Sequence, residues 1–412
     1  MKHGPWLRAN PSARHYRVLA FLNSNVRRLF PVYLTLVIWT IAWTASVNGP
    51  VMPLYVESLG IGIVGWSLLA ASAGLGMFFL EWAWGALYDK VDRRLLMVLS
   101  ALSVSILYPL YTLQGSIPYF IVLQFLTGAI GIAIGPTSRA YVSDESPQKS
   151  VGLFASLWWT FFILGRTIGP LLGSFIAEVW SFQYSFYASA LLSFVTVLLI
   201  LITFPKRDMP RRTSSLNIVG GLKSVLHVRS IGFLFMSALF AFMGVSLIRS
   251  FLPLYGSEQV QMSTLDVGVL ISATSAAQLI AMPSLGWISD RFGRKRMVLL
   301  GFGLSSLAFL LFFVARNSFQ LLLVSLVVSV GLSASSLLLL AVIRDVASNR
   351  LYGTAVGLYG SFEDMGLILG PVVFGLIWSA YSPVLIFAAG ALTQIVGAFF
   401  LLPIVQKRHR RN

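Results

Sequence analysis

The chain alternates between long apolar runs and short polar segments. Apolar runs of about 20 residues, enough for a helix to cross the hydrocarbon core of a bilayer, begin near residues 31, 63, 95, 117, 151 and 185. A polar stretch follows from Lys206 to Ser230, and six more runs begin near residues 231, 265, 296, 319, 353 and 384. The pattern predicts an all-α membrane protein with twelve transmembrane helices in two sets of six.

Composition supports the bilayer as the solvent. The 412 residues are 57% hydrophobic and only 11% charged, whereas soluble proteins carry about 25% charge. The net charge of +16 is spread between apolar runs and forms no single patch, so we expect no nucleic-acid partner. The absence of cysteine excludes disulfides and thiolate chemistry. We expect no metal and no cofactor.

Basic residues are distributed asymmetrically between alternate loops. Of the 30 lysines and arginines, all except Arg166, Arg249 and Arg316 lie in the segments that share a side with both termini. The opposite loops carry the acidic residues Glu57, Glu178, Glu258 and Asp266. Positive charge flanks membrane helices on the cytoplasmic side. We therefore expect a multi-pass plasma-membrane protein with both termini cytoplasmic and residues 1–28 as a tail rather than a removable signal peptide.

The polar centre of the chain has a helical pattern of its own. Within residues 206–230, apolar side chains recur at helical spacing at Leu216, Val219, Leu222 and Leu226. This favours a short helix on the cytoplasmic membrane surface, with a loose linker as the alternative.

The chain repeats itself after 200 or 201 residues. Gly85, Asp89 and Asp144 match Gly286, Asp290 and Asp345, and "GRTIGPLLG" from Gly165 matches "GLILGPVVFG" from Gly366. The repeat predicts two six-helix bundles of the same orientation, residues 29–205 and 231–405, followed by a cytoplasmic tail of residues 406–412. Parallel halves of this kind are related by a pseudo-two-fold axis along the membrane normal and place a binding site between them.

Three motifs in these halves resemble the major facilitator superfamily of secondary transporters. "GWISDRFGRK" from Gly286 fits the family's cytoplasmic loop signature, and "GALYDKVDRR" from Gly85 fits it except for Asp92, where glycine is usual. "GRTIGPLLG" resembles the fifth-helix signature that the family associates with export by antiport. The resemblance covers about residues 29–405 and implies transport by alternating access. Within this family, the chain most resembles the twelve-span drug/proton antiporters.

The two loop motifs are candidates for a cytoplasmic gate. Glycines there let helix ends approach closely, while aspartates accept hydrogen bonds from a helix N-terminus or a guanidinium. The basic residues are expected to lie at anionic headgroups, and plain topology markers are the alternative reading. The gate candidates are Gly85, Asp89, Arg93, Gly286, Asp290, Arg291, Gly293 and Arg294. The helix-packing candidates are Gly165, Gly169, Pro170, Gly173, Gly366, Gly370 and Pro371.

Ionisable residues at membrane depth are the candidates for coupling and substrate binding. Such residues are costly in the bilayer and usually face a cavity. Arg166, Glu363 and Asp364 lie near the middle of their spans and are absent from the equivalent positions of the other half. Glu81 lies closer to the cytoplasm, where it faces the other half or snorkels. Arg249 lies towards the outside, where snorkelling or pairing with Glu57 or Glu258 suffices.

The adjacent carboxyls predict proton chemistry. Two such groups in a low-dielectric cavity do not both ionise, so one of them can exchange protons near neutral pH. Static pairing with Arg166 and direct binding of a cationic substrate remain alternatives. Many exporters of the resembled family carry an arginine in the fourth helix where this chain has Gln124, which leaves the route of coupling open.

These features favour a monomeric secondary transporter that exports small amphiphilic organic compounds in exchange for protons. Alternatives are an uptake permease for a polar metabolite, which would carry more Asn, Gln and Arg at the midplane, a lipid flippase, and a membrane receptor. No span carries a Ser/His, HExxH or phosphate-loop arrangement, so an enzyme is not expected.

Overall fold

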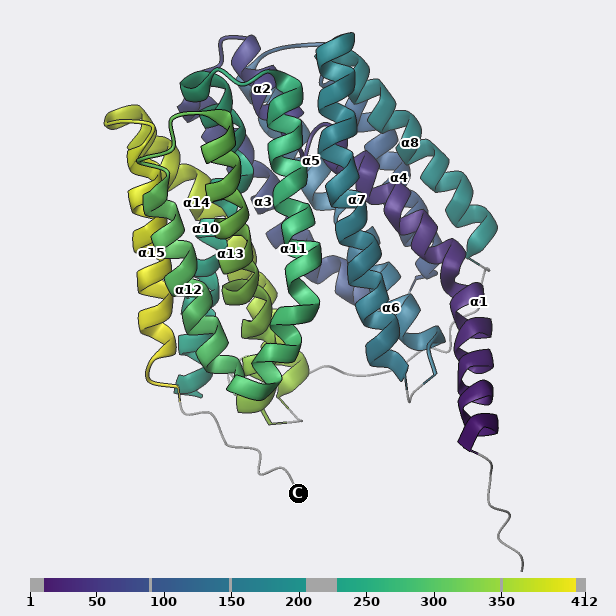
Figure 1. Cartoon of the computed structure of the whole chain (residues 1–412). Coiled ribbons are helices and arrows are strands. Elements are labelled where there is room, and N and C mark those ends of the chain that lie inside the picture. Colours follow the sequence, from purple (N-terminus) through teal and green to yellow (C-terminus); the bar gives the residue numbers. More distant parts are fainter. Residues whose placement is uncertain (1–10, 89–90, 148–149, 205–227, 349–350, 405–412) are drawn as a thin grey trace, which may run out of the picture.

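The computed structural model describes residues 11–88, 91–147, 150–204, 228–348 and 351–404. Within these residues the secondary structure is helical throughout (Figure 1). The first half of the chain forms α1 (Pro11–Ala45), α2 (Val51–Ser58), α3 (Ile63–Tyr88), α4 (Arg93–Leu110), α5 (Ile117–Gly131), α6 (Ile134–Glu145), α7 (Val151–Val179) and α8 (Phe182–Thr203). The second half forms α10 (Arg229–Val260), α11 (Thr264–Phe292), α12 (Arg294–Leu311), α13 (Ser318–Val346), α14 (Tyr352–Ala380) and α15 (Leu385–Leu401).

The all-α membrane architecture predicted from the sequence is confirmed. Ten helical segments among the described residues are long and apolar enough to cross a membrane, and α15 is a shorter apolar helix. One boundary differs from the expectation, because α1 already begins at Pro11 within the segment predicted as a tail. The predicted surface helix of the central linker lies outside the described residues.

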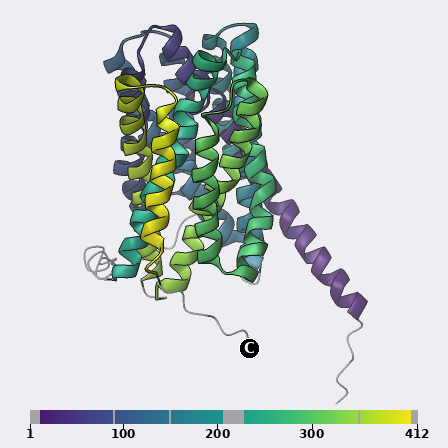
Figure 2. The same cartoon turned by 60° about the vertical axis from the view of Figure 1, so that its left-hand side comes forward.

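The helices of each half pack mainly against one another. In the first half α1 contacts α7 and α8, α3 contacts α5, and α4 contacts α8. In the second half α10 contacts α13, α14 and α15, while α12 contacts α13 and α15. Figure 2 shows the upright helices from a second direction. We call the end at which α1 begins and α15 ends the terminal end, and the opposite end the distal end (Figure 1).

Helix α1 is interrupted before it reaches the distal end. It stops at Ala45, and α2 begins at Val51, directly after Pro50. Proline has no N–H for the helical ladder. A side chain at Gly49 would place its Cβ only 1.9 Å from the carbonyl oxygen of Thr44. The pair Gly49–Pro50 therefore fixes a break in the first span.

Glycines bring α7 against α1. A Cβ at Gly165 would lie 2.6 Å from the Cβ of Thr40, and one at Gly169 would lie 2.1 Å from Oγ1 of Thr44. One turn further, a Cβ at Gly173 would lie 1.6 Å from the carbonyl oxygen of Ala45. Small residues on one face let two helix backbones approach closely.

The second half repeats this packing between α14 and α10. A Cβ at Gly366 would lie 2.5 Å from the carbonyl oxygen of Leu239, and one at Gly370 would lie 1.9 Å from Oγ of Ser246. The glycine motifs that match in sequence thus perform the same packing inside each half.

The halves meet mainly along two helix pairs, α7 with α11 and α3 with α14, with smaller contacts of α2 on α10 and α11. A Cβ at Gly268 of α11 would lie 2.4 Å from that of Ser174, and one at Gly375 of α14 would lie 1.7 Å from Oγ of Ser67. Two further contacts are hydrogen bonds, from the indole Nε1 of Trp66 to the carbonyl of Ser250 (2.9 Å) and from the Leu265 N–H to the Glu178 carboxylate (3.3 Å). All of these contacts lie towards the distal end.

Towards the terminal end the same surfaces separate. On the side of α7 that bears Ser174, residues spaced by whole turns change from buried Ser174 to exposed Thr160 and Ser156. A Cβ at Gly286 of α11 would meet nothing within 4 Å. Figure 1 shows α7 and α11 closest near the distal end and further apart below it. The structure is closed at the distal end and open at the terminal end.

The close packing of α7 on α1 predicts that Gly169→Val destabilises the first half. Added methyl groups would overlap Thr44 and force a shift that costs about 1–3 kcal/mol. We expect a lower melting temperature in detergent and a loss of transport greater than the loss of expression. Gly303→Val is the matched control, because a Cβ there meets nothing within 4 Å. Equal melting temperatures and turnover for the two variants would contradict the packing.

Candidate functional site

A small polar cavity lies between the halves beside the break in the first span. It has a volume of about 50 Å³. Its lining comes from both halves and consists of Val47, Asn48, Gly49, Trp66, Ala70, Ala73, Gly74, Met77, Gln124, Ser246, Arg249, Ser250 and Leu367. A cavity of this size holds water rather than a drug-sized molecule. It therefore marks the closed distal limit of the space between the halves.

A hydrogen-bonded chain crosses this cavity from one half to the other. The Arg249 guanidinium of α10 donates from Nη2 to Oδ1 of Asn48 (2.9 Å). The Asn48 amide nitrogen in turn donates to the hydroxyl of Tyr108 (3.4 Å), and this hydroxyl donates to the carbonyl of Trp43 (3.4 Å). The Arg249 guanidinium of the second half is thus hydrogen-bonded to uncharged groups of the first half.

This geometry corrects the partner expected for Arg249. Snorkelling or pairing with Glu57 or Glu258 is not what the structure shows. The two glutamates line a separate cleft of about 220 Å³ near the distal surface. The difference arises at the break of the first span, because the chain turns at Asn48 and presents its amide to α10.

Arg166 lies near the middle of α7 and faces the space between the halves. Successive helix residues are rotated by about 100°, which places Arg166 between two contact faces. Gly169 on one side packs on α1 of the same half, and Ser174 on the other packs on α11 of the second half. The sector between these faces points to the space between the halves. The side chain is partly exposed there.

The acidic pair lies on α14, with its two carboxyls on different sides of the helix. Glu363 lies one turn after Tyr359, whose ring packs on Phe242 of α10, so Glu363 is on the side of α14 that faces α10. Asp364 is only 8% exposed. It precedes Gly375 by about three whole turns, so it shares the side of α14 on which Gly375 packs on α3. Asp364 therefore sits at the α3–α14 contact between the halves.

Arg166 and the acidic pair are not brought together in this conformation. Arg166 forms no hydrogen bond or ion pair with another described residue, and the charged group with which it interacts is Arg249. Static pairing of Arg166 with Glu363 or Asp364, which the sequence left as an alternative, is therefore not formed in the terminal-open state. In this conformation Arg166 of α7 and Arg249 of α10 are instead separate from the two carboxyls of α14.

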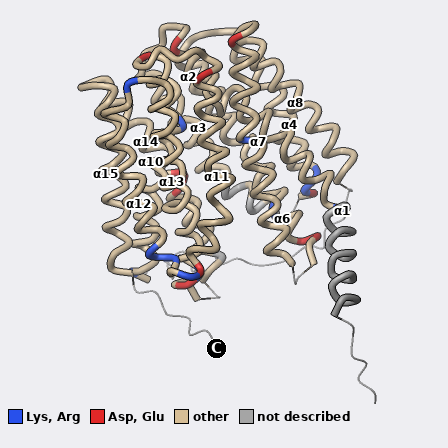
Figure 3. The backbone as a smooth tube through the Cα atoms, viewed as in Figure 1, with Lys and Arg blue, Asp and Glu red and all other residues tan. Residues whose placement is uncertain are grey.

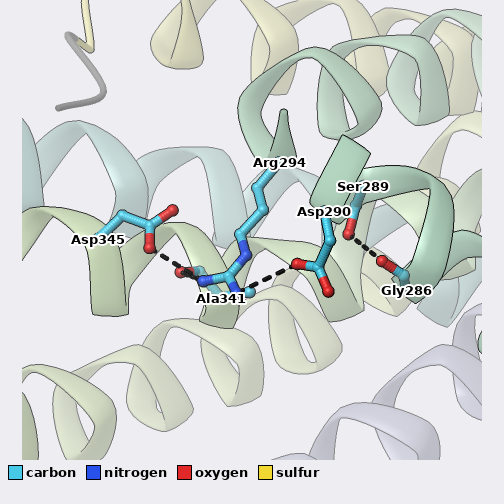
Figure 4. A network of polar contacts seen from close by, with 6 residues as sticks. All are labelled: Gly286, Ser289, Asp290, Arg294, Ala341 and Asp345. Atoms are coloured by element: carbon cyan, nitrogen blue, oxygen red, sulfur yellow. Dashed lines mark hydrogen bonds and ion pairs between the residues drawn. The ribbon is translucent and has the colours of Figure 1, made fainter. Parts of the chain in front are cut away.

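Most other charged residues gather at the two ends of the molecule (Figure 3). At the terminal end the Arg294 guanidinium joins three groups of the second half (Figure 4). It donates to Oδ1 of Asp345 (2.9 Å), to Oδ1 of Asp290 (3.3 Å) and to the carbonyl of Ala341 (3.3 Å). The bidentate fork of arginine suits such bridging, and it ties the start of α12 to the ends of α11 and α13.

The first half contains the same network at positions shifted by 201 residues. Arg93 pairs with Asp144 (2.5 Å) as Arg294 pairs with Asp345. Arg94 donates to the carbonyl of Leu201 (2.5 Å), and its counterpart Lys295 donates to the carbonyl of Leu402 (2.7 Å). Cations favour the carbonyl ends of helices. These basic residues fasten helices within each half, and their expected contact with lipid headgroups stays a prediction.

The structure also explains why the two loop motifs differ at one position. Gly293 begins α12 with φ of +95°, a conformation that a side chain would strain. Its counterpart Asp92 has φ of −56°, and its carboxylate accepts the N–H of Arg94 (3.0 Å) as an N-cap of α4. The first loop therefore replaces a glycine turn by a capping aspartate.

Parts of the predicted gate fall outside the described residues. Asp89 lies outside the described residues, as do the side chain of Glu81 and the surroundings of Gly85. Arg291 is described and stacks on the Trp287 ring at 3.6 Å from its centroid. Of the gate candidates that can be placed, Arg93, Asp290, Arg291, Gly293 and Arg294 lie at the terminal end, where the halves are apart.

Sequence comparison finds transporters across most of the chain. The profile of the Major Facilitator Superfamily matches residues 34–268 and 234–412. A multidrug resistance protein MdtG of Enterobacter lignolyticus is 27% identical over 369 residues, which is 85% of this chain and 86% of the relative. The MdtG protein of Citrobacter koseri is 27% identical over 395 residues, or 90% and 95% of the two chains.

Solved transporters have a similar fold at low sequence identity. A bacterial homologue of the lysosomal transporter Spinster, in an inward-facing and unoccupied conformation, has a TM-score of 0.73 at 13% identity and covers 92% of this chain and 95% of its own. A mutant of the nucleoside transporter NupG has a TM-score of 0.76 at 14% identity, with coverage of 92% and 99%. A POT family transporter in complex with a peptide conjugate has a TM-score of 0.78 at 12% identity, with coverage of 91% and 96%.

The profile match, the relatives and the apolar helices agree on a multi-pass membrane transporter of small molecules rather than an enzyme. The paired helix contacts, repeated loop motifs and repeated glycine packing fit the same conclusion. This chain belongs to the Major Facilitator Superfamily.

Proposed function

We propose that the protein exports small amphiphilic organic compounds in exchange for protons by alternating access. The observation that carries this proposal is the arrangement of the halves, which touch near the distal end and separate towards the terminal end. A second state with the opposite pattern would move a central site from one side to the other. The relatives named multidrug resistance proteins support export as the direction.

The proposal includes twelve spans in two six-helix bundles. The broken pairs α1–α2 and α5–α6 each form one span, and α12 and α15 complete the second bundle. The bundles comprise residues 29–205 and 231–405, joined by residues 206–230. The asymmetry of basic residues supports a plasma-membrane protein with the terminal end, including residues 1–28 and 406–412, in the cytoplasm. The structure then corresponds to an inward-open monomer.

The acidic pair supports proton coupling. A carboxylate at membrane depth is costly unless it is protonated or paired. Asp364 sits at the α3–α14 contact, which must rearrange when the halves rock, whereas Glu363 lies on the side of α14 that packs on α10 of its own half. A change in the surroundings of Asp364 would change its affinity for a proton, so the movement and the proton are linked. Arg166 comes into range of this carboxyl only if the halves move.

The coupling proposal is tested with proteoliposomes under an imposed pH gradient. Asp364→Asn should lower gradient-driven transport by at least about tenfold, a typical effect of removing a proton-transferring group, while substrate exchange at equilibrium persists. Glu363→Gln should affect driven transport less, because Glu363 lies away from the moving contact. Glu258→Gln, a matched change of an exposed side chain at the distal surface, should transport like the wild type. A full response to the pH gradient in both α14 variants would contradict coupling at the acidic pair. Glu81 would then be the next candidate for the coupling residue.

The gate proposal is tested at Asp290. In the terminal-open state its bond to Arg294 is an exposed pair, worth about 0.2–1 kcal/mol. If Asp290 also binds the opposite half when the terminal end closes, Asp290→Asn should favour the open state by about 1–3 kcal/mol.

The reporter for this gate is a single cysteine at Thr160, on the side of α7 that faces α11. Maleimide should label it faster in the Asp290→Asn background. The control is a cysteine at Ile202 on the exposed surface of α8, whose labelling should not change. An unchanged labelling rate of the cysteine at position 160 would contradict a role of Asp290 in the gate and favour a role in topology alone.

A further inference from the structure

Two arginines from different halves converge on the space between them. Arg249 of α10 reaches the first half at Asn48. Arg166 of α7 lies one turn before Gly169, which packs on Thr44, and Thr44 lies four residues before Asn48. Arg166 therefore lies about 5 Å before the level of Thr44 along α7, and beyond Thr44 the first span ends at Ala45 and turns to reach Asn48. The two guanidinium groups interact electrostatically with each other.

Neither cation is neutralised by the protein in this conformation. Among the described residues no carboxylate forms an ion pair with Arg166 or Arg249. The only hydrogen bond of Arg249 to a described side chain goes to the neutral amide of Asn48. Glu57 and Glu258 line the separate distal cleft.

Such an arrangement is unfavourable unless a ligand completes it. A cation at membrane depth is costly, and two that repel each other are more so. Helix packing does not require them, since the glycine and serine contacts described above hold α7 and α10 in place. Arg166 remains partly exposed to the open space between the halves, so an anion entering from the terminal end can reach it.

An apolar surface lies beside Arg166. Trp159 and Phe162 precede it on α7 by about two turns and one turn, on the same side of the helix. Both rings are partly exposed, and they pack edge to face at 5.7 Å. Aromatic walls with a few convergent polar groups are typical of small-molecule sites.

We propose that the transported compound is an amphiphilic anion, whose carboxylate, sulfonate or phosphonate group binds between Arg166 and Arg249 while its apolar body lies against Trp159 and Phe162. This inference rests on the proposed function as a transporter and names its substrate class. Guanidinium groups bind such oxyanions with paired hydrogen bonds. Because Arg166 and Arg249 belong to different halves, the bound anion would also connect the two halves that move relative to each other.

The test uses the full chain in detergent and a matched set of naphthalene probes that differ only in the head group. The head groups are a sulfonate, a neutral hydroxymethyl and a trimethylammonium, and binding is measured by calorimetry. The wild type should bind the sulfonate at least about tenfold more tightly than the ammonium, a difference of about 1.4 kcal/mol. Arg166→Gln and Arg249→Gln should each weaken sulfonate binding by about 10- to 100-fold and change binding of the neutral probe by less than about twofold.

Two controls keep the result interpretable. Arg316→Gln removes the same charge from an exposed position on the distal surface and should leave all three affinities unchanged. If a glutamine variant loses the neutral probe as well, Arg166→Lys and Arg249→Lys replace it. These keep the charge and should bind the sulfonate within about tenfold of the wild type.

The outcomes separate the two proposals. Tighter binding of the ammonium than of the sulfonate, or unchanged sulfonate binding in both glutamine variants, would overturn the anion site and leave the transporter intact. Transport of the probes in proteoliposomes is measured alongside. Sulfonate binding that depends on both arginines, without transport of any probe, would support the site and contradict the transporter.

Discussion

The absence of water in the bilayer core is the constraint on which the rest of this structure depends. Every backbone N–H and C=O at that depth needs a partner within the protein, and a continuous helix supplies it. Irregular backbone is tolerated there only where it is buried or lines a cavity. The break between Ala45 and Val51 obeys this rule, because it lies at the polar cavity and presents Asn48 to Arg249. The fold thus places its least regular backbone where polar groups are useful.

We expect each half to move as a rigid body, because the ion pairs that join its helices lie within that half. Arg93 with Asp144 and Arg294 with Asp345 fasten equivalent helices in each half, and the glycine faces of α7 and α14 lock onto α1 and α10. Contacts between the halves are of another kind. They are small-residue contacts on two helix pairs, together with single hydrogen bonds near the distal end. Such surfaces can separate without unfolding either half, which is what rocking requires.

Much of this architecture could be predicted from the sequence, because its causes are local. Apolar runs predict the helices, and the 201-residue repeat predicts that both halves pack alike. The glycine motif of α7 could be recognised from spacing alone. The role of Asp92 as an N-cap could not, since a capping geometry depends on the turn that precedes it.

The arrangement of charged residues at membrane depth could be predicted only in part. Sequence position gives the depth of Arg166, Arg249 and Asp364, but it does not give the rotation of each helix relative to the other half. For this reason the sequence left pairing of Arg166 with the acidic pair, and of Arg249 with Glu57 or Glu258, as alternatives that the structure does not form.

Reciprocal movement at the two ends tests the central claim most directly. The chain has no native cysteine, so spin labels can be placed in unique pairs across the halves and their separation measured by electron–electron double resonance. Ser156 with Phe292 reports the terminal end, and Val179 with Gln259 reports the distal end. Between the unliganded state and one saturated with a transported compound at altered pH, the terminal distances should shorten while the distal distances lengthen. Distances that stay fixed at both ends, or that change in the same direction, would contradict alternating access.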